Sequence, residues 1–219
     1  MKRIIATVGL VAALAWMGSA DAAVLYTQPY DGTSNSYASQ NDTTGGGFGN
    51  FATVYDNFNL ASSSNITSID FTGGYFNPGA PGNITKFTLT IYSDAAGVPG
   101  SALYTQVVNS NGNELLLGGN IDTYDIATSF NAAAGTPYWL SVVPDLGFPP
   151  QWGWGTSASG SNAGYQCFFG SCGGTGTNFA FTLNGDPINT NSVPEPLTLS
   201  LFGAGLAGLG ALRRRKQKA

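Results

Sequence analysis

Apolar and polar residues alternate with a period of two through most of the interior of this chain. The alternation is clearest around residues 54–60, 69–71, 87–91, 124–130, 138–142 and 179–183. Because successive side chains of a β-strand point to opposite faces, this period predicts half-buried strands. Loops rich in Gly, Pro and Asn separate the runs, as is typical of a sandwich or jelly roll. We therefore predict one all-β, antiparallel β-sandwich or jelly-roll-like domain over residues 23–189.

The composition of the chain agrees with a turn-rich β domain. Charged residues make up only 9% of it, whereas about 25% is usual in a globular protein. A helical bundle would need more Glu, Lys, Arg and Leu. Residues 31–50 are especially rich in Gly, Ser, Thr and Asn and predict a long loop, and residues 190–192 read as a linker.

Residues 1–22 have the three parts of a secretory signal peptide. Lys2 and Arg3 supply the positive region, and an apolar stretch follows over residues 4–17. Ala20 and Ala22 form an A-x-A site, which predicts cleavage by signal peptidase before Ala23. The alternative is a retained membrane anchor, but the apolar stretch is shorter than the roughly 20 residues of a membrane span.

The C-terminal end carries three features in a fixed order. A Val193-Pro194-Glu195-Pro196 motif comes first, a chargeless apolar segment follows over 197–212, and a basic tail ends the chain over 213–218. As a helix, the apolar segment predicts a short transmembrane span of about 24 Å. The basic residues of the tail are expected to stay cytoplasmic, which leaves the domain on the other side of the membrane. These residues are Arg213, Arg214, Arg215 and Lys216.

This order resembles the PEP-CTERM sorting signal of exported proteins in Gram-negative bacteria, over residues 193–218. The resemblance implies recognition by exosortase, a membrane-embedded transpeptidase that is thought to cut near the Pro-Glu-Pro. Val193, Pro194, Glu195 and Pro196 would then be recognition residues rather than catalytic ones. Recognition by a membrane enzyme implies a transient stage at the inner membrane, with the domain on the periplasmic side because the basic tail stays cytoplasmic. The family's association with exopolysaccharide and biofilm production then implies a cell-surface or extracellular destination. A plain C-terminal anchor is the alternative.

The interior also resembles β-sandwich domains of surface-anchored bacterial proteins. Four stretches carry this resemblance, at residues 66–76, 87–94, 97–100 and 135–141. It implies the fold and carries no known activity.

Charge excludes nucleic acid as a partner of the interior. In the interior of the chain Lys86 is the only cation, whereas Asp and Glu are far more numerous there. Such an acidic domain repels phosphates, so we predict no DNA or RNA binding.

The residues that most enzymes and zinc sites need are missing or few. His is absent and only two Cys are present, which excludes His-based catalytic triads and four-thiolate zinc. In an exported protein Cys167 and Cys172 predict a disulfide. A redox pair is the alternative, although the spacing is not C-x-x-C.

Carboxylates are the remaining candidates for chemistry. Glu114 is the only Glu of the domain, and no spacing pairs it with an Asp as a glycoside hydrolase would need; Asp122 and Asp125 read as solvated turn residues. A structural calcium would draw on Asp side chains in loops, although no EF-hand pattern is present; these are Asp31, Asp42, Asp94, Asp122, Asp125, Asp145 and Asp186. We predict no catalytic residues and leave any metal ligands unassigned.

Trp152 and Trp154 fall on the same face of a candidate strand. If exposed, they would form a platform on which sugar rings stack; if buried, they are ordinary core.

Taken together, these features of the sequence predict a non-enzymatic surface or matrix protein. The alternatives are a carbohydrate-binding module using this aromatic face, and a polysaccharide hydrolase.

Overall fold

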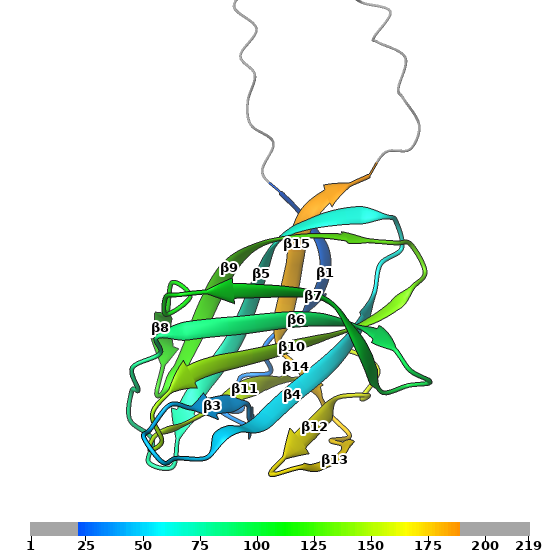
Figure 1. The fold of residues 1–219 in the computed structure, drawn as a ribbon. Helices are drawn as coiled ribbons and strands as arrows, with labels where there is room; N and C mark the ends of the chain where they lie inside the picture. Colours follow the sequence, from blue (N-terminus) through cyan, green and yellow to red (C-terminus); the bar gives the residue numbers. More distant parts are fainter. Residues whose placement is uncertain (1–21, 189–219) are drawn as a thin grey trace, which may run out of the picture.

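A computed structural model describes residues 22–188, which form fifteen strands in two sheets with no helix among them (Figure 1). The sheets lie face to face, so the predicted all-β sandwich is confirmed. Within 22–188 there is consequently no helix capable of crossing a bilayer. The predicted signal-peptide helix (1–22) and transmembrane helix (197–212) fall on residues outside the described part, apart from residue 22.

The eight-stranded sheet is built around the long strand β5 (Ser64–Phe76), which pairs with β9, β11 and β15. One path through the sheet runs β1-β15-β5-β11-β14, while β2 joins β11, and β8 joins β9. The other strands are β1 (Ala23–Gln28), β2 (Ser36–Ala38), β8 (Leu115–Gly118), β9 (Ile121–Ala132), β11 (Gln151–Ser157), β14 (Asn178–Phe179) and β15 (Phe181–Pro187).

The seven-stranded sheet has the order β13-β12-β4-β3-β10-β6-β7. Its one parallel pairing, between β3 and β10, departs from the predicted antiparallel arrangement. The loop predicted over residues 31–50 is also wrong in part, because β2 and β3 lie within it. The strands are β3 (Gln40–Asp42), β4 (Gly49–Asn59), β6 (Lys86–Asp94), β7 (Pro99–Val108), β10 (Pro137–Leu146), β12 (Tyr165–Phe168) and β13 (Ser171–Gly174).

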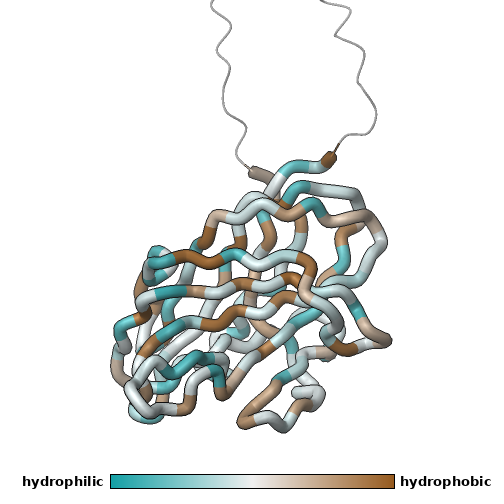
Figure 2. The backbone as a smooth tube through the Cα atoms, viewed as in Figure 1, coloured by the Kyte–Doolittle hydropathy of each residue, from teal (hydrophilic) through white to brown (hydrophobic). Residues whose placement is uncertain are grey.

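The core lies between the two sheets and consists largely of the apolar members of the alternating runs. Figure 2 shows hydrophobic and hydrophilic residues following one another along several strands. Aromatic rings join the layers; for example Phe58 on β4 stacks on Tyr138 and lies edge-on to Phe181 of the opposite sheet. Burial of such rings is the main favourable contribution to folding. The period-two pattern therefore identified the core-facing positions correctly.

The first and last strands place both ends of the domain at one pole. β1 pairs antiparallel with β15, and Ala23 lies opposite Gly185. The start of β1 and the end of β15 consequently emerge side by side (Figure 1). The two predicted delivery segments thus join the domain at neighbouring points.

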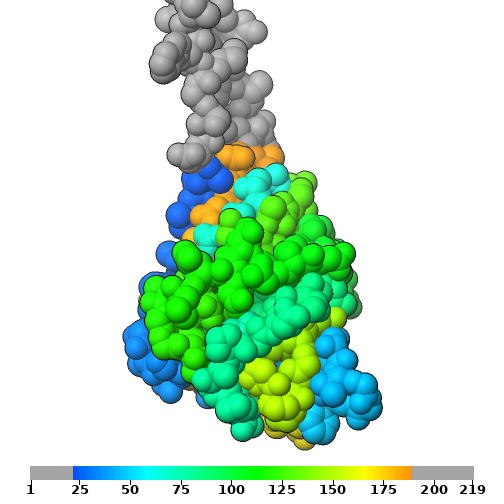
Figure 3. Space-filling model, turned by 90° about the vertical axis from the view of Figure 1, so that its left-hand side faces the viewer, coloured from blue at the N-terminus to red at the C-terminus, as the bar shows by residue number. Residues whose placement is uncertain are grey.

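The strands β7 and β8 are exposed edge strands, and the green segment that contains them covers much of the surface in Figure 3. Each is the edge of its sheet, and neither carries a charged residue. Large apolar side chains are exposed along them, namely Leu103, Val107, Leu115, Leu116 and Leu117. Edge strands of this kind are open to pairing with another chain.

Candidate functional site

A groove opens on the outer face of the seven-stranded sheet, where β4 and β10 part. The two strands pair only as far as Ser141 opposite Tyr55; beyond that point β3 separates them. Ser39, just before β3, spans the fork: its Oγ donates to the Val142 carbonyl at 2.5 Å and accepts from the Val54 N–H at 3.2 Å. The resulting groove has a volume of about 280 Å³.

The strand register brings the lining side chains together in rows across the sheet. One row places Tyr55, Ser141 and Thr90 next to each other on β4, β10 and β6. Another runs from Asn50 through Asn41 and Asp145 to Lys86. The full lining is Asn41, Asn50, Thr53, Tyr55, Lys86, Thr88, Thr90, Tyr92, Ser141, Val143 and Asp145.

The charged groups of the groove neutralise each other. Lys86 Nζ lies 2.7 Å from Asp145 Oδ2, and Asn41 Nδ2 donates to Asp145 Oδ1 at 3.0 Å. Lys86 is the only basic side chain within residues 22–188. The groove therefore offers no net charge, although the domain as a whole is acidic.

Two tyrosines line one end of the groove. The rings of Tyr55 and Tyr92 meet edge to face with centroids 5.4 Å apart, and the Tyr92 hydroxyl lies 3.3 Å from Ser141 Oγ. Burial, and then the neighbouring Tyr92, raise the pKa of Tyr55 to about 12. Its phenol therefore stays protonated at neutral pH and can both donate and accept hydrogen bonds.

The hairpin β12–β13 borders the groove beyond β4, and the predicted disulfide between Cys167 and Cys172 is confirmed in it. Tyr165 of this hairpin packs against Tyr55 and against Trp139 of β10. The bridge joins facing residues of the two strands and so holds this border in place.

Removal of the bridge should cost a moderate amount of stability. A double Cys167→Ser/Cys172→Ser variant is expected to lower the free energy of unfolding by about 2 kcal/mol, because the closed loop is short. Urea unfolding of both proteins measures the difference. Wild type under reducing conditions is the control and should match the variant; equal stability of oxidised wild type and variant would contradict the expectation.

Trp152 and Trp154 lie on the same strand face, as predicted, and that face is turned into the core. Both have 0% exposure. The Trp152 ring meets Tyr124 and Phe87, and Trp154 stacks on Phe179. Neither ring can present a face to a sugar, so the exposed aromatic platform predicted as an alternative at these residues is wrong, and the core interpretation holds.

Asp122 and Asp125 are strand residues of β9, not turn residues, and Asp122 is buried. Burial, and then Glu114, raise the pKa of Asp122 to about 6. Glu114 itself accepts hydrogen bonds from the hydroxyls of Tyr75 and Tyr124, and the latter accepts from Trp152 Nε1 at 3.0 Å. These bonds tie the turn before β8 to the core.

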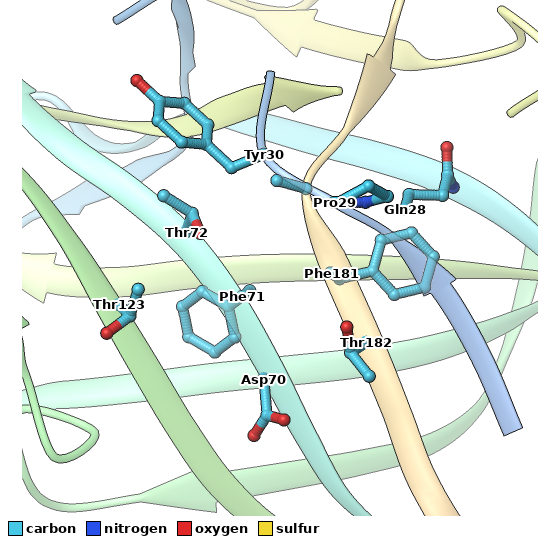
Figure 4. Close-up of a pocket in the computed structure, with 10 residues that line it drawn as sticks. Gln28, Pro29, Tyr30, Asp70, Phe71, Thr72, Thr123, Phe181 and Thr182 are labelled. Carbon is cyan, nitrogen blue, oxygen red and sulfur yellow. The ribbon is translucent and has the colours of Figure 1, made fainter. Parts of the chain in front are cut away.

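A smaller pocket of about 100 Å³ lies on the outer face of the eight-stranded sheet (Figure 4). Figure 4 shows Asp70, Thr123 and Thr182 around it. Asp70 accepts from Asn184 Nδ2 at 2.7 Å, and burial followed by the facing Asp125 raises the pKa of Asp70. Asp70 is the one carboxylate that lines the pocket, with Asp125 opposite it on β9, and the pocket is too small for more than a few water-sized groups.

The Asp residues considered for calcium are dispersed. Asp42, for example, already accepts the backbone N–H groups of Thr44, Phe48 and Phe148, which lower its pKa to about 2 against the opposing effect of burial. Within residues 22–188 no cluster of three or more His, Cys, Asp or Glu is placed to hold a metal. A structural calcium therefore stays a prediction without a ligand set.

The fold and its groove define an all-β sandwich with few charged residues and a polar, open depression on one outer face. The particular kind of protein is given by the C-terminal end, where residues 192–216 match the family model of the PEP-CTERM protein-sorting motif. The chain is thus a PEP-CTERM-containing protein, and the match agrees with the predicted signal at 193–218. The motif implies export, anchoring at the membrane before processing, and processing by exosortase, itself a membrane protein.

The match covers the C-terminal motif and none of the sandwich. Neither the curated proteins nor the solved structures contain a match to this chain.

Proposed function

We propose that this protein is an exported, non-enzymatic protein of the cell surface or extracellular matrix, associated with extracellular polysaccharide. The observation that carries the proposal is the PEP-CTERM match at residues 192–216. Such a signal delivers cargo and needs no catalytic function in the cargo itself. The cargo here is a β-sandwich whose two ends emerge at the same pole, which leaves the opposite pole to face the surroundings.

The engagement of the carboxylates supports a non-enzymatic role. Asp42, Asp145 and Glu114 each accept hydrogen bonds or form an ion pair within the domain. A general acid or base must come within hydrogen-bond reach of the substrate proton that it transfers, whereas these three carboxylates contact groups of the domain itself. Incubation of the purified protein with polysaccharides should therefore release no soluble product.

The processing step is tested by the mass of the mature protein. We expect an N-terminus at Ala23, a C-terminus upstream of the apolar segment 197–212, and recovery in the surface or extracellular fraction. A Glu195→Ala variant should keep its basic tail and remain in the inner membrane. Thr190→Ala, just outside the matched motif, is the control and should be processed normally. Wild type that retains Ala219 in the inner membrane would refute the proposal.

A further inference from the structure

The side chains of the groove on the seven-stranded sheet match the chemistry of a sugar chain. Besides the two tyrosines, four aliphatic hydroxyl groups and two amides line it, on Thr53, Thr88, Thr90, Ser141, Asn41 and Asn50. Hydroxyls and amides can both donate and accept hydrogen bonds, as sugar hydroxyls do. Some of these groups already bond within the domain, as Asn41 Nδ2 does to Asp145 and Thr53 Oγ1 to Asn50 Oδ1, and their remaining hydrogen-bonding capacity suits a polar ligand better than an apolar peptide or a lipid tail.

We propose that this groove binds a short segment of a neutral polysaccharide. The inference rests on the proposed function, because it takes the protein to act among extracellular polymer. It assigns the binding role to residues of β3, β4, β6 and β10, on the opposite side of the core from the buried Trp152 and Trp154.

The charge of the groove selects a neutral ligand. Its single cation and single carboxylate, Lys86 and Asp145, form an ion pair at 2.7 Å. An anionic polymer would meet an acidic domain with no free positive charge in the groove, and would be repelled. A cationic polymer would be attracted to the acidic domain as a whole, but in the groove it would find the one carboxylate already bound by Lys86 and Asn41.

The tyrosines supply an apolar surface at one end of the groove. Tyr55 and Tyr92 are half-buried, so each ring keeps an accessible part while its hydroxyl faces polar neighbours. An aromatic ring with a polar tip suits a sugar, which has apolar C–H faces and a polar rim. Asn50 and Asn41 lie at the other end, so a ligand can contact a ring and an amide at once.

The dimensions and carboxylate content of the groove favour binding over cleavage. Its volume of about 280 Å³ is just below the roughly 300–1,000 Å³ of small-molecule sites, which suits one or two sugar rings of a longer chain. A glycoside hydrolase flanks the scissile bond with two carboxylates about 5 to 9 Å apart. Among the lining residues Asp145 is the one carboxylate, so the groove holds a chain without cutting it.

The test measures binding by the full chain, purified in detergent. The probes are soluble neutral polysaccharides (a β-glucan, a xylan and a galactomannan), with alginate as a polyanion, in calorimetry and in affinity gels. We expect binding to at least one neutral polysaccharide, no binding to alginate, and an affinity that 0.5 M NaCl leaves within about twofold, since screening acts on charges.

Variants locate the binding site. Tyr92→Ala should weaken binding at least tenfold, and the milder Thr53→Val and Asn50→Ala should weaken it about threefold to tenfold, the range of one lost hydrogen bond. Tyr30→Ala removes a half-buried tyrosine at the opposite sheet and should leave binding unchanged. Thermal melts check folding; if Tyr92→Ala does not fold, the two milder variants decide.

Three results would overturn the inference: no binding to any neutral polysaccharide, binding to alginate alone, or wild-type affinity in the folded groove variants. These results are independent of sorting. A protein that binds glucan but remains unprocessed in the inner membrane refutes the proposed function alone, while a correctly exported protein that binds no glycan refutes the groove assignment alone.

Discussion

Replacing Trp152 by alanine is expected to lower the free energy of unfolding by about 4 kcal/mol, the middle of the range for a large buried aromatic side chain. The ring has 0% exposure and bridges both layers, because it meets Phe71 and Tyr124 of the eight-stranded sheet and Phe87 of the seven-stranded sheet. Its removal leaves a cavity between sheets that are each held by their own hydrogen-bonded ladders. The sheets cannot collapse fully into that space.

A polar contribution adds to the packing loss. Trp152 Nε1 donates to the Tyr124 hydroxyl at 3.0 Å, and that hydroxyl donates in turn to Glu114. Trp152→Phe keeps one six-membered ring but loses this donor and part of the packing, so we expect it to cost about 1 to 2 kcal/mol. The difference between the two substitutions measures the packing that the remaining ring supplies.

Urea unfolding followed by tryptophan fluorescence and circular dichroism measures both variants. Leu115→Ala is the control, because Leu115 is 68% exposed and its truncation should change stability by less than about 0.5 kcal/mol. An alanine variant at position 152 with near wild-type stability would mean that the ring is not in the core. It would also mean that Trp152 could be exposed and stack on a sugar ring, as in the alternative prediction for this residue.

The sequence alone was sufficient to predict the strands that form the core. Their alternation places Phe87, Leu89 and Ile91 inward, and the structure buries all three. The same alternation points Thr88 and Thr90 outward, into the groove. These outward hydroxyls indicate a polar outer surface on this strand. The alternation does not give the order of the strands in the sheet, so it cannot predict which residues of β4 and β10 lie beside them.

The short strands β2 and β3 could not be predicted from their residues. Each has three residues in a segment rich in Ser, Asn and Gly, too short for any period to show. Tertiary partners hold them: β2 pairs with β11, and β3 with β4 and β10. Because β3 makes the fork, the groove itself is a product of long-range pairing rather than of local propensity.

The core also contains a carboxylate at a position where the alternating pattern expects an apolar side chain. Asp56 is on the inward face of β4 with 0% exposure. Its Oδ2 accepts from the Phe179 N–H at 2.6 Å and from Gln28 Nε2 at 3.2 Å, so it links the two sheets. Burial nevertheless raises its pKa from 3.8 to about 7 against these hydrogen bonds.

This carboxyl should make the protein less stable as the pH rises from about 4 to about 7. In that window the folded state keeps the Asp56 proton while the unfolded state has lost it, so folding binds a proton. The stabilisation is complete below the unfolded pKa and is lost as the pH passes the folded pKa. Between pH 4.5 and 7.5 the loss amounts to about 3 kcal/mol. Asp122, whose pKa is also raised, contributes in the same direction.

The Asp56→Asn variant isolates this contribution, because an amide does not titrate. We expect the stability of wild type relative to this variant to be greater at pH 4.5 than at pH 7.5 by about 3 kcal/mol, as measured by urea unfolding at both pH values. Asp186→Asn, at an exposed carboxylate of β15, controls for the removal of one negative charge from an acidic domain. The difference in free energy of unfolding between wild type and Asp56→Asn could instead be the same at both pH values, or larger at pH 7.5. Such a result would show that Asp56 is ionised in the folded core and stabilised by the hydrogen bonds from Phe179 and Gln28.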